Sequence, residues 1–288
     1  MKHSFVLFSF LGPLFVSAMA YAYIPPYWMI LSRTADSHGH GVYQIDQDVA
    51  FQHGDEPYIV NEKWTVMGEN SMRLVVTGRK QLQNQIHLTY IYRDGHRYFV
   101  DENGVKKSEH APEDWFEPFL HFRLSKNAKS LAVARGLAPS ISLKSEPFKY
   151  TQKKPTQDPE PFVRLSRVDG TVSYALGTPT PPNSSELLPG LWVEQDHFFV
   201  RRIRFKSQTE ISAQNYKNFH DLWLARDLQI TWPGRQAKVT VNNVVNLGPD
   251  NKNKSHFDPA ELNFGKDPGL ARLLPDEASI RDFYTHMR

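Results

Sequence analysis

The sequence contains no cysteine. This absence excludes a disulfide framework, a thiol nucleophile, a thiolate metal site and a lipid anchor attached through cysteine. Familiar catalytic and nucleotide-binding signatures are missing too, because there is no GxSxG elbow, no Walker glycine loop, no HExxH and no GxGxxG. An enzyme, such as a hydrolase using an unrecognised histidine, is therefore the least supported hypothesis, and we expect a protein that is not an enzyme.

Strong charge is also missing. Without Lys2 the chain has 33 basic residues (34 minus 1) against 31 acidic residues. A near-neutral balance argues against a general nucleic-acid binder.

Long apolar runs are scarce. The one pronounced run spans residues 5–16, only 12 residues, against about 20 for a membrane-spanning helix. Lys2 and His3 precede it, and the small residues Ala20 and Ala22 follow it. This arrangement predicts a secretory signal over residues 1–22, cleaved after Ala22. We expect the periplasm as the compartment, with secretion as the second choice.

The chain has many short stretches in which apolar and polar residues alternate, separated by turn residues such as Asp94-Gly95 and Pro233-Gly234. This pattern predicts antiparallel strands with short connections. The expected strands are 42–51, 58–67, 72–77, 86–93, 97–100, 163–168, 171–176, 191–193, 198–205, 222–232 and 238–247.

Helical patterns are few. A short helix is expected from Tyr27 to Thr34, ended by Gly39 and Gly41. Residues 113–124 and 125–137 are compatible with helix, and a further helix is predicted over 276–287. The domain prediction is one β domain over 23–249, with a helical and proline-rich insertion near 109–161. Residues 250–288 are predicted to be a polar tail that carries the last helix.

The stretch from Leu191 to Phe205 reads LWVEQDHFFVRRIRF and predicts two strands around a polar turn. Arg202 and Arg204 alternate with the apolar residues, and Arg201 breaks the alternation. Arginines in this position form either a solvated strand face or a patch for an anion, such as a lipid phosphate or an acidic partner.

Other polar groups have simpler explanations. His38-Gly39-His40 is better explained as a helix end than as a metal site, because its spacing differs from that of known zinc ligands. Asp46 and Asp48 are expected on a solvated strand face. Glu194, Asp196 and His197 lie in a predicted turn, where polar residues are common. We expect no metal and no cofactor.

Several segments resemble the LolA-like lipoprotein carriers of the periplasm. These segments are 62–66 followed by 72–76, the Asp94-Gly95 hairpin with its aromatic strand, the strand pair 191–204, and the hairpin 230–247. The similarity spans most of residues 27–247, through short and degenerate motifs. Val200 stands where such a strand often carries proline.

The resemblance implies a curved antiparallel sheet forming an incomplete, half-open β-barrel with a helical lid, and no catalytic residues. It also implies a concavity that holds lipid acyl chains or an apolar partner segment. We expect one sheet face to line this cavity, through Trp64, Val66, Met72, Leu74, Val76, Leu88 and Tyr90. The alternative is a structural or interaction protein of the envelope with a filled core, which binds a protein partner.

Overall fold

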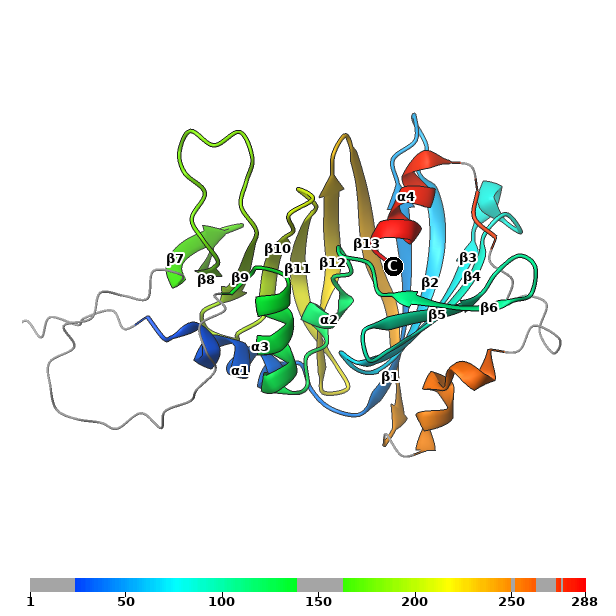
Figure 1. Ribbon diagram of the computed structural model, residues 1–288, viewed down its shortest axis with the longest axis horizontal. Coiled ribbons are helices and arrows are strands. Elements are labelled where there is room, and N and C mark those ends of the chain that lie inside the picture. Colours follow the sequence, from blue (N-terminus) through cyan, green and yellow to red (C-terminus); the bar gives the residue numbers. More distant parts are fainter. Residues whose placement is uncertain (1–23, 139–162, 250–251, 263–272, 276) are drawn as a thin grey trace, which may run out of the picture.

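The structure, a computed structural model, describes residues 24–138, 163–249, 252–262, 273–275 and 277–288. In these ranges the chain forms one antiparallel sheet of 13 strands, in the order β6-β5-β4-β3-β2-β1-β13-β12-β11-β10-β9-β8-β7. The sheet is curved and open, with β6 and β7 as its two edges (Figure 1). The predicted fold class, a mainly β chain with a curved open antiparallel sheet and few helices, is confirmed. The predicted signal segment lies outside the described residues.

The strands are β1 (Val42–Phe51), β2 (Tyr58–Gly68), β3 (Ser71–Gly78), β4 (His87–Arg93), β5 (His96–Val100), β6 (Lys106–His110), β7 (Val163–Val168), β8 (Thr171–Leu176), β9 (Gly190–Glu194), β10 (Val200–Arg204), β11 (Glu210–Phe219), β12 (Leu222–Trp232) and β13 (Arg235–Gly248). The α-helices are α1 (Tyr27–Ser37), α2 (Glu117–Leu120), α3 (Ser125–Ala134) and α4 (Ala278–His286). In the described ranges, short 3₁₀ turns occur at η1 (Lys80–Leu82), η3 (Lys254–Phe257) and η4 (Pro259–Glu261).

The first and last groups of strands join through β1 and β13. Ile45 pairs with Val244 and Val49 with Val239, so strands almost 200 residues apart share one ladder. Both strands alternate buried and more exposed residues, which is the pattern of a sheet covered on one side. One sheet therefore contains both groups of strands. The predicted domain bounds, 23–249 with a tail over 250–288, stay a prediction.

The helices cover one side of the sheet, which we call the inner face. A single apolar cluster joins buried residues of α1, α3 and α4 to those of the strands. In Figure 1, α1 and α3 lie toward the β7 end of the sheet, α2 near the middle and α4 over the region of β13, β1 and β2. The inner face is therefore covered by separate small elements and not by a second sheet.

The end of α1 follows the sequence prediction closely. Tyr27, Ile30, Leu31 and Thr34 are buried along one side of the helix. Gly39 follows with a φ of +93°, and a Cβ at this position would lie 2.2 Å from the Asp221 carbonyl oxygen. Glycine is required here both by the left-handed backbone and by the close approach of the chain.

Two sequence predictions need correction. Residues 113–124 are helical only over α2, because buried aromatic side chains such as Trp115, Phe116 and Phe122 pack an otherwise irregular segment into the core. Strands β6 and β11 were not predicted from the sequence. Every residue of β6 is exposed, and a short charged strand of this kind is typical of a protected sheet edge.

Candidate functional site

The structure brings the seven predicted cavity residues together on the inner face. Trp64 of β2 pairs with Leu74 of β3, which pairs with Tyr90 of β4. The remaining members occupy the neighbouring rows, with Val66 opposite Met72 and Val76 opposite Leu88. All seven are buried, with at most 1% of each residue exposed. Their role as a ligand cavity stays a prediction.

The chain's own side chains cover these residues. Tyr92 stacks between Trp64 and Trp115, with ring centroids 5.8 and 4.3 Å away. Phe283 of α4 packs edge-on against Phe51 at 5.2 Å. A pocket bordered by Trp64 is small, about 20 Å³. The inner face around these residues is therefore filled in this conformation.

A buried ion cluster lies at the centre of this packing. Arg288 is fully buried; its Nε lies 2.9 Å from Glu62 Oε1 on β2, and its Nη1 lies 3.0 Å from Glu117 Oε1 on α2. Gln47 and Trp64 also donate hydrogen bonds to Glu62, at 2.7 and 3.1 Å. We call Glu62, Glu117 and Arg288 the buried triad.

Three aromatic rings surround the guanidinium of Arg288. The ring centroids of Trp64, Phe116 and Phe283 lie 5.3, 4.5 and 4.8 Å from it. These distances are those of cation–π contacts, and such contacts strengthen where water is excluded. The guanidinium therefore has both charge partners and aromatic faces.

The pKa shifts follow from this geometry. Burial disfavours the charged form of Arg288, but Glu62 and Glu117 outweigh it and raise the pKa of Arg288. Burial likewise opposes ionisation of Glu117, and Arg288 with His121 outweighs it, so the pKa of Glu117 is lowered. His121 Nε2 lies 3.2 Å from Glu117 Oε2. Glu117 and Arg288 are thus held in their charged forms.

The triad was not predicted from the sequence, although the sequence contains one signal for it. Glu62 shares the parity of Trp64 and Val66, so its carboxylate lies on the apolar side of the strand. A buried carboxylate requires a partner. The identity of that partner could not be predicted, because Arg288 is 226 positions away in sequence.

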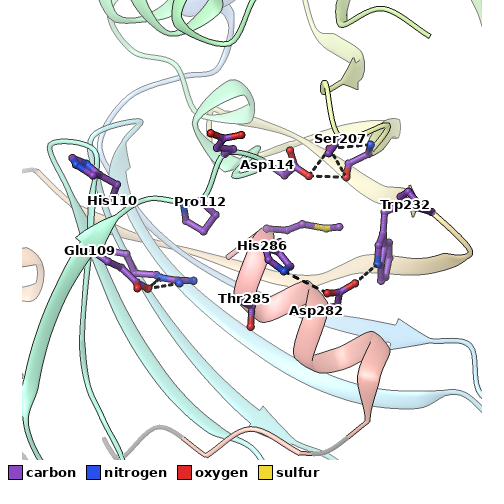
Figure 2. A pocket seen from close by; sticks show the side chains of 14 residues that line it. Glu109, His110, Pro112, Asp114, Ser207, Trp232, Asp282, Thr285 and His286 are labelled. Atoms are coloured by element: carbon purple, nitrogen blue, oxygen red, sulfur yellow. Dashed lines mark hydrogen bonds and ion pairs between the residues drawn. The ribbon is translucent and has the colours of Figure 1, made fainter. Parts of the chain in front are cut away.

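A cleft of about 510 Å³ opens beside α4 (Figure 2). Asp282, Thr285 and His286 of α4 form one wall, and Asp114 and Ser207 lie across from them. Asp114 accepts a hydrogen bond of 2.6 Å from the Ser207 hydroxyl. Both apolar and charged side chains line the cleft, and four of its residues carry carboxylates: Glu109, Glu113, Asp114 and Asp282.

The three arginines near residue 200 do not form one patch. A register shift between Val200 and Arg202 separates Arg201 from the other two. Arg201 forms an ion pair with the buried carboxylate of Glu194.

Arg202 and Arg204 share another carboxylate, Glu210, at 3.4 and 2.7 Å, and both lie over the ring of Trp192. Each of the three predicted arginines therefore has a carboxylate partner within the chain. An anion or partner site at these residues stays a prediction.

Among the residues with described positions, no group of three or more His, Cys, Asp or Glu side chains is arranged to hold a metal ion. No helix in the described part of the chain is long and apolar enough to cross a membrane.

Comparison with known proteins finds likeness in structure only. No protein-family model and no curated protein sequence matches the chain. A crystal structure of a LolA superfamily protein from Nitrosomonas europaea matches with a TM-score of 0.50 at 10% identity, covering 80% of this chain and 97% of that one.

Two further structures match with a TM-score of 0.48, each covering 82% of this chain and 97% of the other. One is a domain from Vibrio parahaemolyticus described as an outer membrane lipoprotein-sorting protein, at 13% identity, and the other is a DUF1329 family protein from Desulfovibrio piger, at 10%. The first match shows that the chain has a LolA-like fold, as the sequence resemblance predicted.

Proposed function

We propose that this protein is a non-enzymatic carrier or sensor of the periplasm, which binds lipid acyl chains or lipoprotein at the inner face of its sheet. One observation carries the proposal: the apolar inner face of an open sheet is covered by short, separate elements. Such elements can leave the sheet one at a time, whereas a second sheet could not. The LolA-like fold supports the same function by analogy only, because a fold does not by itself determine function.

The ligand would take the place now filled by side chains of α4 and of the segment around α2. Trp64, Leu74 and Tyr90 would then line an apolar surface suited to an acyl chain, because their exposure to water is unfavourable by roughly 25 cal/mol per Å². An acyl chain restores that burial when the covering element moves away. In this proposal the seven predicted residues contact the ligand only after that movement.

The test uses tryptophan fluorescence and a brominated fatty acid, which quenches tryptophans that it contacts. We expect quenching at micromolar concentration, and a smaller quenched fraction in Trp64→Phe. Trp223→Phe is the matched control, because Trp223 is 36% exposed whereas Trp64 is 1% exposed.

Lipids extracted from protein purified out of the native envelope should include a bound acyl species, identified by mass spectrometry. If no acyl species co-purifies and quenching is equal in both variants, the carrier proposal is wrong. The filled inner face then favours the alternative, an envelope protein that binds a protein partner.

A further inference from the structure

Helix α4 packs on the inner face of the sheet, and a cleft lies on each side of it. The cleft of about 510 Å³ in Figure 2 borders Asp282 and His286. A second cleft of about 350 Å³, on the side of β5, borders Arg281 and Thr285. The helix therefore contacts the protein through one face, on which Ile280, Phe283 and Tyr284 are buried.

The helix has little to hold it in place on its own. It is nine residues long and has no side-chain cap at its N-terminus. Isolated helices of this length are marginal in water. Its docked position depends on its contacts with the sheet and with α2.

The sheet contacts the last turn of α4 through a second arginine. Arg97 of β5 is buried, and its Nη1 donates to the Tyr284 carbonyl oxygen at 3.1 Å and also to the Arg288 carbonyl oxygen. Glu109 of β6 holds the same guanidinium by accepting from its Nε at 2.7 Å. Carbonyl groups at the end of a helix lack partners within the helix, so Arg97 serves as a receptor for them.

The triad adds a receptor for a cation. Glu62 and Glu117 belong to β2 and α2, and they converge on the guanidinium of Arg288. An apolar side chain of similar size would fill this space without the unfavourable desolvation of three charges. The two carboxylates therefore select a basic residue at this position, whereas filling the core would need only an apolar side chain.

We propose that Arg97, Glu62 and Glu117 form a binding site for the end of a basic amphipathic helix, and that residues 278–288 occupy it in cis. The ligand that displaces them is a helical peptide segment of a partner protein, with apolar side chains and a lysine or arginine just after its last helical turn. An acyl chain carries no cation, so the carboxylates of Glu62 and Glu117 favour a peptide with a basic residue over an acyl chain. This inference rests on the proposed function, because it places the partner segment at the same inner face.

The test uses the full chain with one nitroxide label. Because the chain has no cysteine, His286→Cys provides a unique attachment point on the exposed side of α4. An acetylated synthetic peptide of residues 277–288 is titrated in and label mobility is followed. A second peptide carries Arg288→Met. We expect the native peptide to mobilise the label at a concentration at least about tenfold lower than the Met peptide.

Variants of the receptor separate the possible outcomes. In Glu62→Gln protein the preference for the native peptide should fall to about twofold or less, whereas Glu210→Gln, which alters an outer carboxylate, should retain it. Equal response of the original protein to both peptides, or no response to either, overturns this inference. Mobilisation by a fatty acid with no response to peptides also overturns it, while leaving the carrier proposal intact. If the protein responds selectively to the peptide but shows no quenching by the fatty acid, only the proposal that it carries acyl chains is refuted, and this inference stands.

Discussion

Replacing Arg288 with methionine tests whether the buried triad stabilises the fold. Methionine fills a similar volume, but it leaves the carboxylates of Glu62 and Glu117 buried without their cation. Removing one partner of a buried ion pair typically destabilises a protein by about 3–5 kcal/mol. Gln47 and Trp64 still donate to Glu62. We therefore expect the lower end of that range, about 3 kcal/mol.

A double-mutant cycle isolates the interaction. Glu62→Gln alone leaves Arg288 paired with Glu117 and should cost about 2 kcal/mol, because one charged contact is lost. In the double variant, neither Glu62 nor Arg288 remains as an unpaired charge. The free energy of unfolding should therefore fall by about 2 kcal/mol less than the two single effects together.

Urea unfolding at pH 7, followed by tryptophan fluorescence and circular dichroism, measures all four proteins. Arg93→Met is the control, because the Arg93 side chain is 52% exposed and lies 3.6 Å from the exposed carboxylate of Asp94. It should change the free energy of unfolding by less than about 0.5 kcal/mol. Strict additivity of the two triad variants, or an Arg288→Met effect no larger than the control, would refute the reasoning.

The pH dependence gives a second check on the triad. The pKa of Glu117 is lowered in the fold, so the stabilisation from its ionised form is present above the unfolded pKa and is lost as pH falls through the folded pKa. Arg288→Met removes the main cause of that lowering. The loss of stability on acidification that comes from Glu117 should therefore be smaller in this variant. In urea titrations at several acidic pH values, its free energy of unfolding should fall less steeply with decreasing pH than that of the original protein.

Three further predictions concern single residues. Burial, His121 and Arg123 lower the pKa of His38 to about 3, so the unfolded chain binds a proton that the folded chain does not. The free energy of unfolding should fall as pH drops from about 6.5 toward 3, and His38→Asn should flatten this slope in urea titrations at several pH values. Gly39→Ala should lower the free energy of unfolding by about 3 kcal/mol or more, because the added Cβ would clash with the Asp221 carbonyl oxygen. Gly54→Ala is the control: this residue also has a positive φ but open space around it, so the loss should be about 1 kcal/mol. Equal losses in thermal unfolding would contradict the clash. In urea unfolding, Trp64→Ala should lower the free energy of unfolding by about 3–5 kcal/mol, because Trp64 is buried. Trp223→Ala should lower it by less than about 1 kcal/mol, because Trp223 is exposed. Similar losses in both variants would mean that the inner face is not the core.

The sequence predicted strands well where one side of the strand is buried. The hairpin 163–168 and 171–176 and the strand 222–232 have the predicted ends. Strand β11 was missed because, beyond Ala213, its residues are mostly polar and exposed. Its place in the sheet is determined by pairing with β10 and β12, which a single segment does not reveal.

The candidate site could be predicted only in part. Parity correctly predicted that residues such as Trp64, Leu74 and Tyr90 share a face, because neighbouring strands pair in simple antiparallel register. Parity does not predict what covers that face. The packing of Phe283 and Arg288 onto it depends on the path of the chain after β13, and no local pattern encodes that path.

Whether the inner face is a filled core or a ligand site depends on the free energy with which residues 278–288 dock. If docking is favourable by about 3 kcal/mol, the open form is populated at roughly 1% or less, and the apparent affinity for a ligand falls by about 150-fold. A carrier built this way protects its apolar surface from water when empty. It binds strongly only a ligand that brings its own contacts to Glu62, Glu117 and Arg97, or one that arrives with a partner that removes α4. Variants of the docked segment that weaken its docking, such as Arg288→Met, leave Glu62, Glu117 and Arg97 intact and should strengthen the affinity for such a ligand by up to the same factor.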